Sequence, residues 1–444
     1  MTEPGGTVSS MEKAAGGERL ATTRIGAHLA SPLYRNAYYL IIGAGSGALL
    51  GFLFWTLAAR HYSEQAVGLN FVVISAMMLS SSVCQLGLGG ASGVLVRYLP
   101  GAGDWTRPLV RRAYALTIAL SVVVGLCVAL TSSFWAREST FLRGSVWWVL
   151  AFVFATVTWT IFTIEDSVLT GLRQARWVPL ENSLFSALKV VLLFAFITVS
   201  PRGGIFLAWS IPALILIVPV NLLIFRHLIP RHLQRGYQVP LHVGTIVRLA
   251  AGMYVGGLFL IASTTLLPIL VAGDRGLRQT AYFSIPWTIA TSIQLVALNT
   301  TTSLTVEVAY DESKLRDYFR GILWQTMRLV VPVVTILVAG AHYILLAFGE
   351  AYAREGATTL RLLALATIPN VFVMLGISVA RIHHDARLAL LIPATAGVLT
   401  IGLSLLLLPR AGIDGVGAAV LVAQSVVAVW ALAGPLRRVY FPRG

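Results

Sequence analysis

The chain has 444 residues, of which 57% are hydrophobic and only 11% are charged, and its mean hydropathy is +0.80. Soluble domains carry charge on about a quarter of their residues, so this composition excludes a soluble globular fold. The formal net charge of +15 would suggest nucleic acid as a partner of a soluble chain. Here the basic residues lie mainly in loops between apolar segments, where anionic lipid headgroups attract them, and we expect no nucleic-acid partner.

Apolar segments of about 20 residues or more recur from Asn36 to Leu436. Each is long enough to cross ~30 Å of hydrocarbon as a helix. Because lipid offers no hydrogen-bond partner to the backbone, these segments must be helices. The predicted spans are 36–59, 67–96, 109–131, 145–171, 180–199, 203–225, 245–271, 279–306, 320–347, 358–380, 387–408 and 412–436. The sequence therefore predicts an all-α polytopic membrane protein with about twelve transmembrane helices.

The spans divide into two groups of six. The predicted organisation is a disordered cytoplasmic tail at 1–35, a six-helix lobe at 36–225, a cytoplasmic linker at 226–244, a six-helix lobe at 245–436 and a tail at 437–444. The first 35 residues lack the apolar core and cleavage site of a signal peptide. Residues 58–65 and 272–279 show a weak sequence similarity, and each segment joins the first two helices of its half. This similarity favours two duplicated lobes around a central cavity, an arrangement that is typical of transporters.

Basic residues are distributed unevenly between the two sides of the predicted bundle. With the N-terminus inside, 23 of the 33 Lys and Arg residues fall on the cytoplasmic side and nine on the outer side. Cytoplasmic loops carry such an excess, so both termini are expected in the cytoplasm. The internal connections are shorter than about 20 residues, which is too short for a soluble catalytic domain.

Lys189 is the most informative polar residue, because it falls near the middle of the fifth span, where an ammonium group is costly without water or a counter-charge. Asn182 and Ser186 share its helix face, so we expect the three to line a polar substrate cavity. The alternative is a structural ion pair with Glu165 or Asp166 on the preceding span. Those two carboxylates point about 100° apart, which argues against a dyad, although either can serve as a proton site for coupling.

Polar residues on the second and eighth spans occupy matching places in the two lobes. They either form hydrogen bonds between helices or line a cavity, and their matching places in the two lobes favour the cavity. The residues expected in the cavity are Asn70, Gln85, Gln294 and Asn299. The basic residues expected at the cavity mouth, from their places at span ends, are Arg60, Arg97 and Arg248.

Several catalytic motifs are missing from the sequence. It contains no GxxxxGK[ST] phosphate-binding loop and no HExxH motif, and its eight histidines are scattered. We therefore expect neither ATP hydrolysis by a P-loop nor a metal site, and no cofactor. Cys84 and Cys127 lie in apolar spans, where small core residues are expected rather than a disulfide. The chain is expected not to be an enzyme, and a membrane-embedded glycosyltransferase or ligase is the second alternative.

Short motifs give the chain a resemblance to a known family. They are LAARHYS at 57–63, VGL at 67–69, GLG at 87–89, VRYLP at 96–100, LAFGEAY at 346–352 and GVGAA at 415–419. The chain from Asn36 onward resembles bacterial polysaccharide flippases of the multidrug/oligosaccharidyl-lipid/polysaccharide exporter superfamily.

The resemblance implies a two-lobed bundle of twelve helices. Such a protein moves an undecaprenyl-pyrophosphate-linked oligosaccharide from the inner to the outer leaflet of the bacterial cytoplasmic membrane by alternating access. Membrane lipids surround it, and polysaccharide polymerases and glycosyltransferases are its implied partners. A diphosphate headgroup needs a hydrated cationic cavity, for which Lys189 is the deep cation. The runner-up is a multidrug exporter of the same superfamily, favoured by the Glu165 and Asp166 pair and by Trp159 and Trp287.

Overall fold

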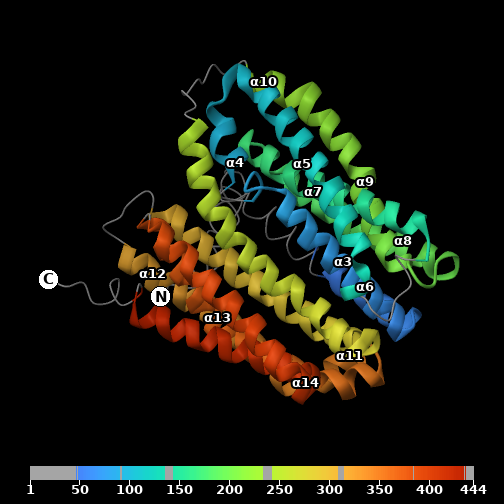
Figure 1. Ribbon diagram of the computed structural model, residues 1–444. Helices are drawn as coiled ribbons and strands as arrows, with labels where there is room; N and C mark the ends of the chain where they lie inside the picture. The colour runs from blue at the N-terminus through green and yellow to red at the C-terminus, as the bar shows by residue number, and fades with distance from the viewer. Residues whose placement is uncertain are drawn as a thin grey trace, which may run out of the picture.

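The computed structural model of the chain describes residues 47, 49–90, 93–135, 144–233, 243–308, 315–383, 385–434 and 436. Side chains are described over the same ranges except 243–253, 296–308, 315 and 386. Every regular element in these ranges is a helix (Figure 1), so the all-α prediction is confirmed there. The predicted tails at 1–35 and 437–444 lie outside the described residues.

The N-terminal lobe begins with a helix over residues 49–61, which is the described part of the first predicted span. The following helices are α3 (Glu64–Cys84), α4 (Val94–Tyr98), α5 (Thr106–Leu130), α6 (Ser132–Trp135), α7 (Val146–Gly171), α8 (Trp177–Val199) and α9 (Gly204–Leu223). Serine residues cap the starts of two of them. The hydroxyl of Ser63 accepts a hydrogen bond from the backbone N–H of Ala66 in α3, and Ser145 does the same for Trp147 in α7.

The helical path of α9 runs past the predicted span end at residue 225. It continues through a π-helical turn, Ile224–Leu228, and then α10, Ile229–Leu233. This extension packs against the rest of the N-terminal lobe. Ile229 is 1% exposed, and the ring of His232 contacts the carbonyl oxygen of Leu99 at 3.0 Å. Burial of this apolar face explains why the chain stays helical where the sequence predicts the start of the linker. Residues 234–242 of the predicted linker lie outside the described residues, and residues 243 and 244 already belong to the next helix.

The C-terminal lobe contains four continuous helical stretches. They are α11 (Val243–Val308), α12 (Leu315–Leu346), α13 (Glu350–Ile382) and α14 (Ala386–Ala433). Gly276 interrupts α11 with φ 80°, and Gly412 interrupts α14 with φ 60°. This left-handed region favours glycine, so each interruption separates two helices at the point where the sequence predicts a break between spans.

The number of spans follows from these interruptions. Nine described helices are long and apolar enough to cross a membrane, with α11 and α14 counted once each. Each of those two holds a pair of helices, and the helix at 49–61 precedes all of them. The described residues therefore agree with the predicted twelve spans. Two boundaries differ most. α3 ends at Cys84, twelve residues before the predicted end of its span at residue 96, and α13 begins at Glu350, about two turns before the predicted start of its span at residue 358.

The two lobes pack against each other along α3 and α11. In Figure 1 the blue to green helices form one group and the yellow to red helices form the other, with α3 and α11 between them. The contact is close enough to require a glycine. A Cβ atom at Gly68 would lie 1.8 Å from the carbonyl oxygen of Leu277. The hydrophobic core crosses this junction, joining residues such as Trp55 and Phe71 to Ala281.

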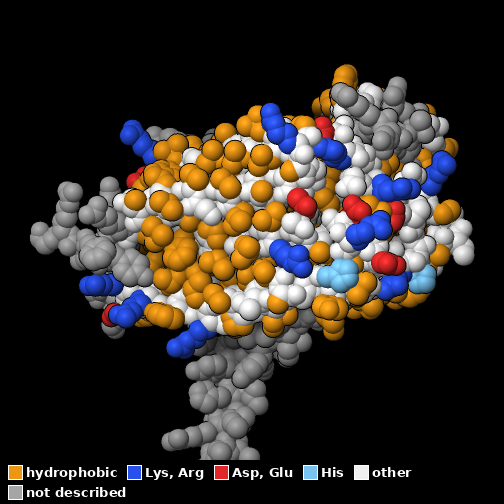
Figure 2. Space-filling model, turned by 90° about the horizontal axis from the view of Figure 1, so that it is seen from below, with side chains coloured by type: hydrophobic (Ala, Val, Ile, Leu, Met, Phe, Trp, Pro, Cys, Tyr) orange, Lys and Arg blue, Asp and Glu red, His pale blue; other side chains and the backbone are white. Residues whose placement is uncertain are grey.

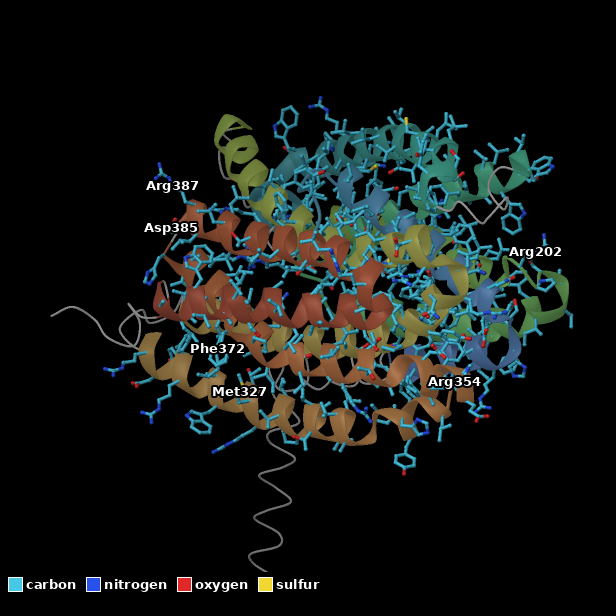
Figure 3. All side chains as sticks on the ribbon, turned by 60° about the horizontal axis from the view of Figure 1, so that its bottom comes forward. Arg202, Met327, Arg354, Phe372, Asp385 and Arg387 are labelled. Carbon is cyan, nitrogen blue, oxygen red and sulfur yellow. The ribbon has the colours of Figure 1, made fainter. Side chains whose placement is uncertain are left out.

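The outer surface of the bundle is suited to lipid. Many large apolar side chains are exposed, among them Val123, Phe154, Ile336 and Leu406. Figure 2 shows a broad area of hydrophobic side chains with Lys and Arg side chains at its margins. In Figure 3, Arg202 and Arg354 lie at one end of the molecule and Arg387 lies at the other. An apolar belt between charged ends is the surface that a bilayer requires.

Candidate functional site

Lys189 is held inside the N-terminal lobe by aromatic rings. Its side chain is 5% exposed on α8. Its Nζ atom lies 4.4 Å from the ring centroid of Trp209 in α9. The same atom lies 5.3 Å from the centroids of Phe54, on the helix at 49–61, and of Phe185, one turn earlier in α8. A cation–π contact of this kind contributes about 0.5–2 kcal/mol, so three ring faces offset part of the cost of burying the ammonium group.

The three rings nearest to Lys189, Phe54, Phe185 and Trp209, are called the Lys189 cage below. One further ring supports them from behind. Trp159 of α7 lies with its ring centroid 5.6 Å from that of Phe185 and 6.0 Å from that of Trp209. The cage is therefore fixed by side chains from four helices. This mutual packing favours one rotamer for each ring and gives the cage a defined shape.

The predicted ion pair of Lys189 with Glu165 or Asp166 is not formed. Within the described part of the chain, Lys189 makes neither a salt bridge nor a hydrogen bond. Glu165 instead lies beside Glu181, which precedes Lys189 by eight residues, or about 12 Å along α8. The aromatic rings take the place of the counter-charge that the sequence reasoning required.

A buried carboxyl cluster lies nearer the start of α8. Glu165 is 0% exposed and Glu181 is 4% exposed, and their carboxyl groups lie close enough to interact electrostatically. Neither carboxyl oxygen of Glu181 has a hydrogen-bond partner among the described residues. The amide of Asn221 in α9 donates to Glu165 Oε1. The amide of Asn182 donates weakly, at 3.5 Å, to Asp166 Oδ2.

Sequence reasoning found only part of this cluster. It predicted Glu165 and Asp166 as separate carboxyl groups, but it missed Glu181 and Asn221. A signal was available, because Glu181 immediately precedes the predicted polar face and Asn221 lies in an otherwise apolar span. The cluster joins side chains from three helices, and such a contact has no periodic signature in the sequence.

The predicted cavity face of α8 therefore touches two different environments. Asn182 belongs to the carboxyl cluster and also donates to the backbone carbonyl of Val178 at 3.0 Å. Ser186 is 7% exposed and lies between the two environments, and Lys189 lies in its cage. The structure thus keeps the three residues on one helix face. Their contact with a substrate stays a prediction.

The two polar residues predicted on α3 serve neighbouring helices. The amide nitrogen of Asn70 donates to the carbonyl oxygens of Ala66 and Arg202, both at 2.7 Å, and its oxygen accepts from the backbone N–H of Phe206. Asn70 therefore ties the start of α9 to α3. Gln85 is half-buried and donates to the hydroxyl of Thr163 in α7 at 3.1 Å.

The remaining predicted residues are more scattered. Arg97 is exposed on α4, and Gln294 is half-buried in α11. The structure does not describe the side chains of Arg248 and Asn299. A separate hollow of about 720 Å³ runs along one face of α12, lined by Gly321, Trp324, Gln325, Arg328 and Leu329.

Arg60 joins the two lobes at one end of the molecule. Its Nε atom donates to the carbonyl oxygen of Ala347 at 2.9 Å, and its Nη2 atom donates to that of Leu346 at 2.7 Å. Leu346 is the last residue of α12, whose C-terminal carbonyl groups attract a cation. Nearby, Arg278 Nε lies 3.2 Å from Glu64 Oε2. Together these contacts form an interlobe latch, consisting of Arg60, Glu64 and Arg278.

The interlobe latch borders a hollow between the lobes. The hollow has a volume of about 590 Å³, and its walls include Tyr62 from one lobe and Tyr352 from the other. Next to it, the rings of Phe52 and Phe348 meet edge to face with centroids 5.1 Å apart. Arg60 thus lines a hollow between the lobes while its guanidinium group is held by the C-terminal lobe. Its predicted role toward a substrate stays a prediction.

Comparisons with known proteins show which solved structures have a similar fold. No protein-family model and no curated protein sequence matches the chain. Its structure is similar to that of a multidrug resistance MATE family transporter of the MOP superfamily in an inward-facing conformation, with a TM-score of 0.66, 16% identity and coverage of 89% of this chain and 94% of that one. The outward-facing conformation gives a TM-score of 0.63, 16% identity and coverage of 91% and 95%.

A mutant of the Vibrio cholerae MATE transporter VcmN is similar as well. Its TM-score is 0.59 at 15% identity, and the match covers 93% of this chain and 98% of that chain. At such low identity the likeness concerns the fold. The chain therefore has the two-lobed, all-helical fold of MATE transporters, which confirms the predicted fold class.

Proposed function

We propose that this chain is a membrane transporter that works by alternating access between its two lobes. The observation that carries the proposal is the nature of the interlobe latch. It consists of exposed hydrogen bonds and one exposed ion pair, which are contacts that water can replace at small cost. Polar contacts of this kind at one end of the junction can open and close, while the apolar packing of α3 against α11 keeps the lobes together.

The direction of opening follows from charge. The excess of basic residues in the loops predicted to be cytoplasmic puts the end that holds Arg60 on the outer side of the membrane. A latch closed at the outer end corresponds to an inward-facing state.

The first candidate substrate is a lipid-linked oligosaccharide with an anionic diphosphate headgroup. The motif resemblance to polysaccharide flippases supports it, and so does Lys189, a cation near the middle of its span. The polyprenyl tail of such a substrate stays in lipid while the headgroup passes between the lobes. The net charge of +15 favours an anionic headgroup at the entrance as well.

A multidrug exporter is the second candidate. The buried carboxyl cluster of Glu165, Asp166 and Glu181 favours it, because carboxylates inside a membrane mark pathways for cations and protons. The similar solved structures include a multidrug resistance MATE transporter, which adds weight to this candidate.

The two candidates differ in what accumulates when the chain is deleted. A flippase deletion should leave lipid-linked oligosaccharide on the cytoplasmic leaflet while its synthesis continues. A drug exporter deletion should instead raise cellular retention of cationic dyes and leave the oligosaccharide distribution unchanged. Purified protein in liposomes with fluorescent lipid-linked oligosaccharide provides the direct assay. Loss of the sugar-transfer step itself in the deletion strain would contradict both candidates and favour an enzyme.

A further inference from the structure

The Lys189 cage has an unusual occupant. A buried ammonium group in a protein is ordinarily met by a carboxylate or by several hydrogen-bond acceptors. Here the described contacts of the ammonium group are the faces of three aromatic rings, at 4.4, 5.3 and 5.3 Å. The carboxyl cluster on the same helix lies about two turns away and does not reach it.

Three aromatic faces around one cation form the arrangement by which proteins recognise organic ammonium ions. The rings attract the cation through their negative faces and need no hydrogen-bond geometry. Trp209 provides the nearest face, and Trp159 packs behind it and fixes its orientation. The Lys189 cage therefore has the form of a ligand site, filled by a residue of the chain itself.

We propose that Phe54, Phe185 and Trp209 form a binding site for a small organic ammonium ion, and that Lys189 fills this site from within and excludes such cations. Lys189 then acts as a specificity-determining residue that keeps cationic amphiphiles out of the N-terminal lobe. This consequence for substrate choice rests on the proposed transport function. The proposal that the cage binds an organic ammonium ion is independent of the proposed transport function.

The size of the vacated space selects the probe. Changing Lys189 to Ala removes Cγ, Cδ, Cε and Nζ, and n-propylammonium replaces these four atoms one for one. 1-Propanol has nearly the same shape without the charge and is the matched neutral control. Lys189→Met keeps most of the side-chain volume, so it should fold and leave no room for either probe.

Binding is measured on the purified full-length protein in detergent, by titration calorimetry and by the rise of Tm with probe concentration. We expect Lys189→Ala to bind n-propylammonium at least about tenfold more tightly than the wild-type protein does, and more tightly than it binds 1-propanol. The double change Lys189→Ala and Trp209→Leu should lose this binding, because it removes the nearest ring face.

Several outcomes decide the proposal. Equal binding of the charged and neutral probes by Lys189→Ala, or no binding by the folded variant, would overturn it. Recovery of folded Lys189→Ala only when n-propylammonium is present would support it. Failure to recover that variant in either condition, while Lys189→Met is recovered, would show that the side chain serves packing and would also overturn the proposal.

A transport assay separates this proposal from the proposed function. Liposomes with Lys189→Ala should take up n-propylammonium faster than liposomes with the wild-type protein. If the probe binds as expected while the wild-type protein moves no lipid-linked oligosaccharide, the binding site is supported and the proposed substrate is contradicted. If the wild-type protein moves the oligosaccharide but the probe does not bind to Lys189→Ala, the proposed function is supported and the proposed binding site is contradicted.

Discussion

Removing the side chain of Arg60 should shift the protein toward the conformation that is open at the latch end. Arg60→Ala deletes two hydrogen bonds, of 2.9 and 2.7 Å, between the N-terminal lobe and the end of α12. Each contributes a net of about 0.5–1.5 kcal/mol, and we do not add a full charge bonus because Arg60 is exposed. The loss of about 1–3 kcal/mol corresponds to a roughly 5- to 150-fold change in the ratio of closed to open molecules.

The shift can be measured as a distance between the two lobes. Spin labels at His61 and Arg354, both exposed, report the separation in a background without Cys84 and Cys127. The wild-type protein should give one short distance by pulsed electron resonance, and Arg60→Ala should add a longer one.

An arginine within a single lobe provides the matched control. Arg361 Nε donates to the carbonyl oxygen of Val338 at 3.2 Å, also on α12, but both residues belong to the C-terminal lobe. Arg361→Ala should therefore leave the distance distribution unchanged. If Arg60→Ala leaves it unchanged as well, or if both variants broaden it equally, the latch does not control this end of the molecule.

Three other predictions concern packing, the carboxyl cluster and topology. Gly68→Ala should lower the free energy of unfolding by about 1–3 kcal/mol or more, seen as a lower Tm, because its Cβ would lie 1.8 Å from a carbonyl oxygen, whereas Gly257→Ala has open space and should be near neutral. Asn221→Ala should cost about 1–3 kcal/mol by the same assay, since it leaves a buried carboxyl group without its donor, and an unchanged Tm would contradict this. A membrane-impermeant thiol reagent added outside cells should label a cysteine at Arg354 and not one at Arg387, and the reverse pattern would invert the topology.

The sequence by itself determined the transmembrane architecture. Spans are set by the thickness of the bilayer and by the need to satisfy the backbone internally, and both constraints act on each segment separately. For this reason the break at Gly276 falls between two predicted spans, and the break at Gly412 falls at the first residue of the last one. The two-lobed fold could likewise be predicted before any contact was known. The unusual burial of Lys189 could also be read from its position alone.

Only the tertiary structure decided what each polar residue contacts. Lys189 faces aromatic rings rather than a carboxylate, because Trp209 and Phe54 reach it from helices that the sequence places without fixing their rotation. Glu165 lies beside Glu181 of a neighbouring helix. Arg60 binds the backbone carbonyl oxygen of Ala347, which is 287 residues away in the sequence. Hydrophobic periodicity records which face of a helix is apolar, but a polar pair depends on the register between helices, which packing of the whole bundle sets.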